Sequence, residues 1–474
     1  MQRLFIDELH KHIEKPVLIK GWVDIRRDHG KLIFLDIRDM SGKVQCVVLA
    51  QHAEVKSAAE QLRPEWVIAG EGIVHKRPEK LVNKEEVCGD IEIELTQLNV
   101  INPAATPVID VRGDGRDIGE EVRLKYRYLD IRRPRMQRNL RTHAKVGKFI
   151  RDYLTARRFT EVSTPILTKT TPEGARDFLV PARKAPGSFY ALPQSPQQYK
   201  QLLMVGGLER YFQIARCFRD EDPRADRAYG EFTQLDMEMS FVTQEDILQL
   251  AEGLFTELAE TLFPEKYISQ KPWPRLTHKE AIEKYGSDKP DLRKDKNDPN
   301  ELAFAWTLDF PLFTEQREDD FFHGSGKAAF APSHHMFTAP HPDDVHLLDS
   351  DPTKVRGLQH DMVLNGFEVG GGSVRIHDAK VQEKVFDLIG FSVEQKKQFT
   401  HMLEAFSYGV PPHGGIAPGI DRFVMTALGE SSIREVIAFP MTGNGRTAVM
   451  EAPSPASEEQ LKELGIEIRK QGME

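Results

Sequence analysis

The sequence predicts two domains, a small all-β barrel followed by a larger α+β domain built on an antiparallel sheet flanked by helices. Three observations predict this division. Short segments with strand periodicity fill residues 17–101, and a mixture of long helices and strands begins near Asn139. Between them runs INPAATPVIDVRGDG, which is rich in proline and glycine. We expect domains at residues 1–105 and 139–474, joined by a hinge over 106–138.

The first domain contains five predicted strands. Their sequences are VLIKGWVDIR, LIFLDIR, VQCVVLA, WVIAGEGIVHK and IEIELTQLNVI. A short helix near Lys56–Leu62 separates the third strand from the fourth. Five short strands with a helix in that place are typical of a small Greek-key barrel of the OB type.

One face of this barrel carries residues suited to RNA. In LIFLDIR, Ile33, Leu35 and Ile37 are expected to point inward. Phe34 and Asp36 then face outward, and by the same alternation so does Gln45 on the next strand. Phe34 lies beside Arg26 and Arg27, and an exposed ring next to cations can stack on a base of single-stranded RNA. An ordinary surface aromatic residue or a protein contact is the alternative interpretation.

The second domain begins with a predicted helix, NLRTHAKVGKFIRDYLTARRF, which continues into the extended TEVSTPIL because Pro165 prevents a helix there. Further strands are expected at Tyr211–Arg219, Phe232–Phe241, Phe304–Leu308 and Asp361–Asn365. The polar stretch Lys289–Asn300 is expected to be a surface connector, and the chain after Ile433 a loop-rich extension.

Composition restricts the possible classes of protein. With 474 residues, 40% of them hydrophobic and 29% charged, the chain is typical of soluble globular proteins. It has no apolar run of about 18 residues and no apolar core of a secretory signal near its start, so we expect no membrane contact. Cys46, Cys88 and Cys217 lack the spacing of a disulfide framework or a zinc site, which fits a reducing cytoplasm.

The charge is distributed unevenly. The net charge is −9, yet residues 110–160 contain 15 Lys and Arg against 7 Asp and Glu. A local basic segment can grip phosphates even on an acidic protein. A solvated linker and helix is the alternative interpretation of the same charges.

The segment FRDEDPRADRAYGEFTQLDMEMSF, residues 218–241, is the first of three that indicate chemistry. Its second half alternates, with Leu235, Met237, Met239 and Phe241 on one face and Phe232, Gln234, Asp236 and Glu238 on the other. Arg219 at a strand end is suited to phosphate, Phe232 can stack on a purine, and Glu221 can accept a hydrogen bond from an exocyclic amine. A solvated hairpin would explain the charged loop equally well.

The second segment is APGIDRFVMTALG, residues 417–429. Glycine and proline lead into a helix whose first turn carries Arg422, so backbone N–H groups and a guanidinium meet in a place favourable to an anion. Arg422 could instead simply pair with Asp421 or another acid.

The third segment is DMVLNGFEVGGGSVRIH, residues 361–377. Asp361 and Glu368 offer oxygen ligands for Mg²⁺, which is usually shared with substrate phosphates. Three consecutive glycines let a ligand approach the backbone, and Arg375 lies just beyond them. A glycine hairpin with incidental charges is the alternative.

Together these segments resemble the class II aminoacyl-tRNA synthetases, and in detail the bacterial-type aspartyl-tRNA synthetases. Residues 139–165 resemble the first class motif, a dimer-forming helix and strand; FRDE with EF resembles the second motif and GIDR the third. TPEGARDF, QSPQQYKQLLM and GGGSVRIH are more specific than the class motifs, and the resemblance covers nearly the whole chain. It implies an N-terminal OB barrel that reads the anticodon, a class II catalytic domain and a homodimer.

The resemblance also implies how ATP and Mg²⁺ are held. Arg219 would bind the α-phosphate and Arg422 the γ-phosphate, while Arg422 and Phe232 sandwich the adenine. Glu221 would contact the adenine, and Asp361 with Glu368 would hold Mg²⁺. The residues implied for ATP are Arg219, Glu221, Phe232, Glu368, Gly419, Ile420, Asp421 and Arg422, of which Arg219, Glu368 and Arg422 are the catalytic ones.

For L-aspartate, the resemblance implies that Lys200 and Arg375 pair with the side-chain carboxylate. The remaining residues implied for this substrate are Glu173, Gln197 and Asp236 around the ammonium group, His334 or His335 closing over it, and Arg219. The expected reaction is formation of aspartyl-adenylate and diphosphate, followed by transfer of aspartate to the 3′ end of its tRNA.

In the barrel, Arg27, His29, Phe34 and Gln45 would contact the tRNA anticodon. His29, in RRDHG, stands where strictly discriminating bacterial relatives commonly have leucine, so it resembles a non-discriminating subgroup that also charges asparagine tRNA. The sequence departs from the family in two places. The domain that bacterial members carry between the second and third motifs is replaced by the short connector 289–300, and the loop RAYGEF is one residue longer than usual.

Other functions fit these residues less well. An asparaginyl or lysyl synthetase is disfavoured because Lys200 and Arg375 would repel a basic substrate and leave an amide mispaired. A catalytically inactive paralogue that only binds tRNA predicts loss of Arg219, Glu368 or Arg422, and all three are present. An ATP-dependent amide ligase on the same scaffold would not need the barrel with Phe34.

Overall fold

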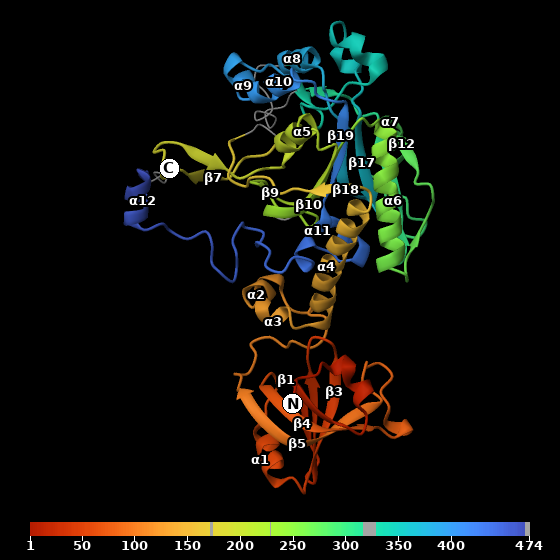
Figure 1. Ribbon diagram of the computed structural model, residues 1–474, viewed down its shortest axis with the longest axis vertical. Helices are drawn as coiled ribbons and strands as arrows, with labels where there is room; N and C mark the ends of the chain where they lie inside the picture. Colours follow the sequence, from red (N-terminus) through yellow and green to blue (C-terminus); the bar gives the residue numbers. More distant parts are fainter. Residues whose placement is uncertain (171–173, 228, 316–328, 470–474) are drawn as a thin grey trace. The chain divides into compact units, whose positions relative to one another are not determined.

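The computed structural model describes residues 1–170, 174–227, 229–315 and 329–469. The chain forms two compact units, Met1–Gly113 and Asp114–Glu474 (Figure 1). The division falls inside the predicted hinge, so residues 114–138 belong to the second unit rather than to a linker.

The first unit is a closed five-stranded barrel with strand order β1-β2-β3-β5-β4. Its elements are η1 (Ile6–His12), β1 (Pro16–Asp28), β2 (Leu32–Arg38), β3 (Lys43–Leu49), α1 (Ala53–Gln61), β4 (Val67–Lys76), η2 (Glu79–Leu81) and β5 (Ile91–Asn102). Every predicted strand is present, and the helix separates β3 from β4 as expected. Ile33, Leu35 and Ile37 are completely buried, which confirms the inward face of β2.

The second unit is built on an eight-stranded sheet. In spatial order its strands are β12 (Arg275–Thr277), β14 (Phe304–Leu308), β17 (Gln359–Leu364), β18 (Phe367–Val374), β19 (His413–Pro418), β10 (Gly230–Ser240), β9 (Arg210–Arg219) and β6 (Thr160–Glu161). The six inner strands, β14 to β9 in this order, are antiparallel to one another, as predicted. The two edge strands are parallel to theirs, so the sheet is mixed at both edges.

Three short strand pairs lie outside this sheet. They are β7 (Leu179–Pro181) with β8 (Phe189–Ala191), β11 (Tyr267–Ile268) with β13 (Glu301–Leu302), and β15 (Phe313–Glu315) with β16 (Phe330–Pro332). The connector 289–300 runs between α7 and β13 without helix or strand.

Helices make up much of the rest of the second unit. They are α2 (Glu120–Lys125), α3 (Arg127–Asp130), α4 (Pro134–Thr155), α5 (Gln197–Val205), α6 (Gln244–Leu262), α7 (His278–Tyr285), α8 (Ala379–Leu388), α9 (Val393–Lys397), α10 (Thr400–Phe406), α11 (Ile420–Leu428) and α12 (Glu458–Leu464), with 3₁₀ turns η4 (Pro342–Leu348), η5 (Pro352–Lys354) and η6 (Ile433–Glu435). The long helix predicted from Asn139 is α4, which begins earlier because Pro134 is tolerated in a first turn. Among the described residues, none of the helices combines the length and apolar character needed to cross a bilayer.

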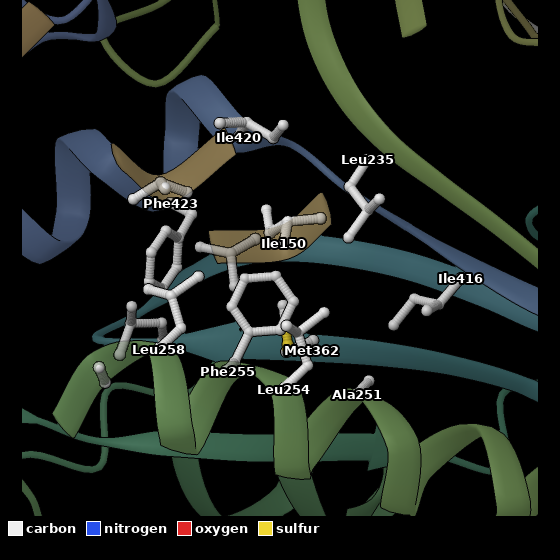
Figure 2. Close-up of a cluster of buried hydrophobic side chains, with 14 of the residues drawn as sticks. Ile150, Leu235, Ala251, Leu254, Phe255, Leu258, Met362, Ile416, Ile420 and Phe423 are labelled. Carbon is white, nitrogen blue, oxygen red and sulfur yellow. The ribbon is translucent and has the colours of Figure 1, made fainter. Parts of the chain in front are cut away.

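The main hydrophobic core lies between the sheet and helices α4, α6 and α11. Ile150 of α4, Phe255 of α6 and Phe423 of α11 meet there over strand residues such as Leu235 and Ile416 (Figure 2). The rings of Phe255 and Phe423 pack edge to face with centroids 5.0 Å apart. Each such fully buried side chain contributes about 1.5–3 kcal/mol to stability.

Strand β10 presents one face to this core, as its alternation predicts. Leu235, Met237 and Met239 are buried in the core. The prediction is wrong for Phe241, which is 69% exposed. The strand ends at Ser240, and a left-handed φ of 58° at Phe241 turns the chain toward Thr243, the N-cap of α6.

A buried ionic network fastens the start of α4 to the segment after α11. Arg123 donates two hydrogen bonds to the Glu435 carboxylate, at 3.0 and 2.7 Å. Arg135 bonds Glu430 at 2.7 Å and Glu435 at 2.8 Å. Burial raises the pKa of Glu435, but the arginines outweigh it and lower that pKa overall.

For four arginines of the basic segment 110–160, buried pairing within the chain replaces the predicted role of gripping phosphates. Arg123, Arg127, Arg133 and Arg135 are all buried, and each donates to a carboxylate of this chain. Arg123 and Arg135 fold inward against acids about three hundred residues later in the sequence, and Arg127 and Arg133 pair with the nearby Asp130; in each case pairing offsets the cost of burial. These four arginines are therefore structural.

Replacing Glu435 with glutamine is expected to lower the free energy of unfolding of the second unit by about 3–5 kcal/mol, because Arg123 and Arg135 stay buried after losing a carboxylate partner. Urea denaturation followed by circular dichroism measures the change. The matched control is Glu463→Gln, since Glu463 pairs with Arg183 on the surface and should change stability by less than about 0.5 kcal/mol. Equal effects of the two substitutions would contradict the structural role of the network.

Candidate functional site

A cavity of about 260 Å³ opens on the polar side of the sheet in the second unit. It lies where β10, β18 and β19 run side by side, between α5 and the start of α11. The cavity brings together most of the site residues predicted from the sequence. These are Gln197, Lys200, Arg219, Glu221, Phe232, Asp236, His334, His335, Glu368, Arg375, Gly419, Asp421 and Arg422. Residues separated by more than two hundred positions thus share one pocket.

The floor of the cavity is a cluster of four buried charges. Lys200, on α5, places its Nζ 3.0 Å from the carboxylate of Asp236 and 3.4 Å from that of Glu238. Arg375, after β18, donates to both oxygens of Glu238, at 2.9 and 3.2 Å. Ser373 accepts a further hydrogen bond from Arg375 at 2.8 Å. Each of the four charged residues is at most 3% exposed.

The pKa values of the two carboxylates of this cluster shift in opposite directions. Burial raises the pKa of Asp236 more than the Lys200 cation lowers it. Burial also acts on Glu238, but Arg375 and Lys200 together overcome it, so the pKa of Glu238 is lowered. Glu238 is therefore the firm counter-ion of the two cations, and Asp236 is the more adaptable acid.

Glu238 was not among the predicted site residues. The signal was present, because Glu238 follows Asp236 on the polar face of the same strand. Asp236, which is predicted to lie beside a ligand ammonium group, accepts a hydrogen bond from the Lys200 ammonium in this structure.

The opposite end of the cavity is rich in arginine. Arg219, the last residue of β9, has its guanidinium carbon 5.1 Å from the ring centroid of Phe232. Arg422 donates to the backbone carbonyls of Asp226, at 3.0 Å, and Glu368, at 2.5 Å. This end can bind an anion together with a flat ring.

The loop between β9 and β10 adds residues that the sequence did not single out. Arg224, Asp226 and Arg227 line the cavity beside the predicted Glu221. Arg227 donates to the Glu221 carboxylate at 2.6 Å, so this acid is engaged by the loop itself.

Asp361 and Glu368 form a pair of carboxylates beside this end. Asp361 is buried on β17, and a Cβ added at Gly371 would lie 3.2 Å from its Oδ1 and 3.5 Å from Oε1 of Glu368. Burial and then the charge of Glu368 raise the pKa of Asp361 well above its usual value. Burial would do the same to Glu368, but Lys289 and Arg422 lower its pKa.

This pair fits a hard divalent cation that is shared with a ligand. Two carboxylates around a glycine gap supply oxygen donors of the kind that Mg²⁺ prefers. Within residues 1–170, 174–227, 229–315 and 329–469 no set of three His, Cys, Asp or Glu side chains gathers for a metal. The remaining ligands would have to be phosphate oxygens or water.

The side chains of two predicted ATP contacts, Ile420 and Asp421, are held by contacts within the protein. The side chain of Ile420 is buried in the hydrophobic core, so its contact with a ligand is limited to the backbone (Figure 2). Asp421 is also buried, and it accepts hydrogen bonds from the Thr233 backbone at 2.7 Å and from His143 at 2.8 Å. Asp421 thus ties α4, β10 and α11 together. Glu173 lies outside the described residues.

In the first unit, the four residues predicted to contact the anticodon lie on one side of the barrel. Arg27 donates to both oxygens of Asp36 at 2.8 Å and approaches Gln45 at 3.4 Å. The rings of His29 and Phe34 meet edge to face with centroids 5.6 Å apart. The outward-facing Asp36 is only 9% exposed, because Arg27 covers it.

Comparison with protein families agrees with this architecture. Residues 119–443 match the model of the class II tRNA synthetases (D, K and N), and residues 17–101 match that of the OB-fold nucleic acid binding domain. Solved structures of similar fold include asparaginyl-tRNA synthetase from Pyrococcus horikoshii, with a TM-score of 0.74 and 24% identity over 93% of this chain and 98% of that one. A putative aspartyl-tRNA synthetase from Leishmania major has a TM-score of 0.74 and 21% identity over 94% of each chain. At these identities the structures show the fold alone.

Other relatives have a higher sequence identity to this chain than these solved structures do. The aspartate–tRNA(Asp/Asn) ligase of Rubrobacter xylanophilus is 42% identical over 96% of this chain and 95% of its own length. The aspartate–tRNA ligase of Geobacillus kaustophilus is 40% identical over 96% and 97%. The first alignment extends over 581 residues, more than the 474 of this chain, so that relative contains a substantial segment that this chain lacks. The chain belongs to the class II tRNA synthetases of the D, K and N group, among the bacterial aspartate–tRNA ligases.

Proposed function

We propose that this protein activates L-aspartate with ATP to aspartyl-adenylate and transfers it to the 3′ end of aspartate tRNA and also of asparagine tRNA. The observation that carries the choice of amino acid is the buried cluster at the cavity floor, where Lys200 and Arg375 share Asp236 and Glu238. The two cations favour a ligand with a carboxylate at its side chain, and the acids favour a ligand with an ammonium group.

Charge balance explains the selectivity. When all four groups are ionised, the cluster of Lys200, Arg375, Asp236 and Glu238 is neutral. L-Aspartate adds a side-chain carboxylate between the two cations and an ammonium group that can donate hydrogen bonds to Asp236. These two charges cancel, so the buried site stays neutral. Asparagine adds the ammonium group without the side-chain anion and leaves an excess positive charge in a dry site, which is costly. Lysine adds a second cation and is disfavoured further.

The arginine-rich end supports binding of ATP. Arg219 lies beside Phe232 and lines the same cavity as Lys200 and Arg375, so it can hold the α-phosphate of an ATP whose adenine stacks on Phe232. Arg422 can hold the γ-phosphate and cover the adenine from the side opposite Phe232. When ATP binds, the Glu221 carboxylate would accept a hydrogen bond from the exocyclic amine of the adenine in place of the one it now accepts from Arg227.

Activation then needs positioning and charge stabilisation. The α-carboxylate is already an anion and attacks the α-phosphorus in line, so no general base is required. Arg219 stabilises the charge that develops on the α-phosphate, and Arg422 stabilises the departing diphosphate. Asp361 and Glu368 would hold Mg²⁺, which supplies further neutralisation of the phosphate charge when bound.

The barrel supports recognition of tRNA. Phe34 offers a face for stacking, and Arg27 and Gln45 lie next to it on the neighbouring strands. His29 covers one edge of the Phe34 ring, where it can contact a neighbouring base. Relatives with the name aspartate–tRNA(Asp/Asn) ligase agree with a dual specificity.

Two further features belong to this proposal. We expect two copies to pair through residues 139–165, as in the first class motif, and the enzyme to work in the cytoplasm. The segment that relatives carry and this chain lacks would fall at the connector 289–300, outside the buried cluster of Lys200, Asp236, Glu238 and Arg375 at the cavity floor. Its loss is therefore compatible with catalysis.

ATP–diphosphate exchange measured with each of the twenty amino acids tests the proposed substrate. Only aspartate should stimulate exchange. Lys200→Met should lower kcat/KM for aspartate about a hundredfold or more, because it removes the cation that would pair with the aspartate side chain, and loss of one partner of a buried charge pair costs about 2–5 kcal/mol of binding. The matched control Lys184→Met, on the surface, should leave exchange unchanged. Stimulation by asparagine or lysine in place of aspartate would refute the assignment.

Charging of purified aspartate and asparagine tRNA transcripts tests the dual specificity. The wild-type rates should lie within about a hundredfold of each other, and His29→Leu should reduce charging of the asparagine transcript about tenfold more than that of the aspartate transcript, a difference near 1.4 kcal/mol. The control His10→Leu replaces another histidine of the barrel surface and should affect neither. An equal loss with both transcripts would show that His29 does not discriminate.

A further inference from the structure

Lys289 lies in the cavity but outside every motif by which the family was recognised. It belongs to the connector that follows α7, and its Nζ is 3.1 Å from Oε2 of Glu368. The side chains of Lys289 and Glu368 are 36% and 29% exposed, so the pair sits at the mouth of the cavity and not in its floor.

The backbone on either side of Lys289 is anchored. The Lys289 N–H donates to the Ser287 hydroxyl at 3.1 Å, and the carbonyl of Asp288 accepts a hydrogen bond from Thr307 of β14 at 2.8 Å. On the other side, Asp291 accepts two hydrogen bonds from the Arg293 guanidinium at 3.0 and 2.7 Å. The connector thus holds the Lys289 backbone in place while its long side chain stays free to change rotamer.

The Lys289 ammonium is a positive charge in direct contact with the Glu368 carboxylate. Arg422, the other cation near Glu368, donates to the backbone carbonyl of that residue instead of its carboxylate. Lys289 therefore forms the direct ion pair with the Glu368 carboxylate, while Arg422 acts on that carboxylate through its charge alone. The Lys289 ammonium therefore occupies the side of the Glu368 carboxylate that a divalent cation would otherwise bind.

We propose that Lys289 is a placeholder cation for the nucleotide end of the cavity. It neutralises Glu368 while no nucleotide is bound, and when ATP enters it releases Glu368 to the divalent cation and donates to the β- and γ-phosphates. This inference rests on the proposed function, because it assigns Lys289 a role toward a polyphosphate and its metal.

Two consequences with opposite signs follow. Because the ammonium and the divalent cation compete for Glu368, removing the ammonium strengthens metal binding to the nucleotide-free enzyme. Because the same ammonium later contacts the phosphates, removing it weakens binding of ATP and diphosphate. A salt bridge that only stabilised the connector would change neither affinity.

The test compares Lys289→Met and Lys289→Arg with the control Lys284→Met, an exposed lysine in the last turn of α7. Binding of Mn²⁺ to the nucleotide-free protein, measured by electron paramagnetic resonance, should tighten about tenfold in Lys289→Met. The KM for ATP and for diphosphate in the exchange reaction should rise about tenfold, while the KM for aspartate stays unchanged. Lys289→Arg, which keeps the cation, should remain close to the wild type in both measurements.

The outcomes separate this inference from the proposed function. Wild-type protein that shows no exchange with any amino acid would refute the proposed function. An active wild type with Mn²⁺ affinity or KM for ATP unchanged in Lys289→Met would overturn the role of Lys289 alone. Lower thermal stability of Lys289→Met with both affinities preserved would also overturn it, because that result identifies a structural salt bridge.

Discussion

The structure depends on one constraint: charges that are removed from water must be paired within the protein. Strand β10 illustrates it, since one face buries Leu235 in the hydrophobic core while the other face carries Asp236 and Glu238. Those acids are stable in the interior only because Lys200 and Arg375 reach them from α5 and from the end of β18. The pairs that make burial possible are also the groups that can recognise a small zwitterionic acid, so stability and specificity have the same origin.

The same constraint gives the arginines of this chain two different roles. Arg123 and Arg135 are buried with Glu435 and hold the start of α4 against the segment after α11. Arg219 and Arg422 instead line a cavity, where Arg219 lies near the Phe232 ring and Arg422 donates to two backbone carbonyls and lies 3.7 Å from the Asp226 carboxylate. Arg219 and Arg422 are partly exposed at the cavity wall and so available to an anionic ligand, whereas Arg123 and Arg135 are buried among carboxylates of the chain itself.

Local patterns determined much of the fold. Alternation in LIFLDIR and in the β10 segment identified the strands and their buried faces, and these were confirmed, apart from Phe241, where a left-handed residue ended the strand early. Pro134 marked the beginning of α4, although the prediction started it at Asn139. Most predicted residues of the site were identified from short motifs, because the family's chemistry places arginine, glutamate and glycine at fixed short spacings.

What only the tertiary structure decided is which charges meet. Glu238 joins Lys200 and Arg375, Arg123 joins Glu435, and Lys289 joins Glu368, and each pair connects residues that are tens to hundreds of positions apart. The amino-acid sequence by itself determined the strands, their polar faces and the motif residues, since these depend on neighbours along the chain. Ion pairing depends on distance in space and on exclusion of water, and both arise only when the sheet and its helices have assembled.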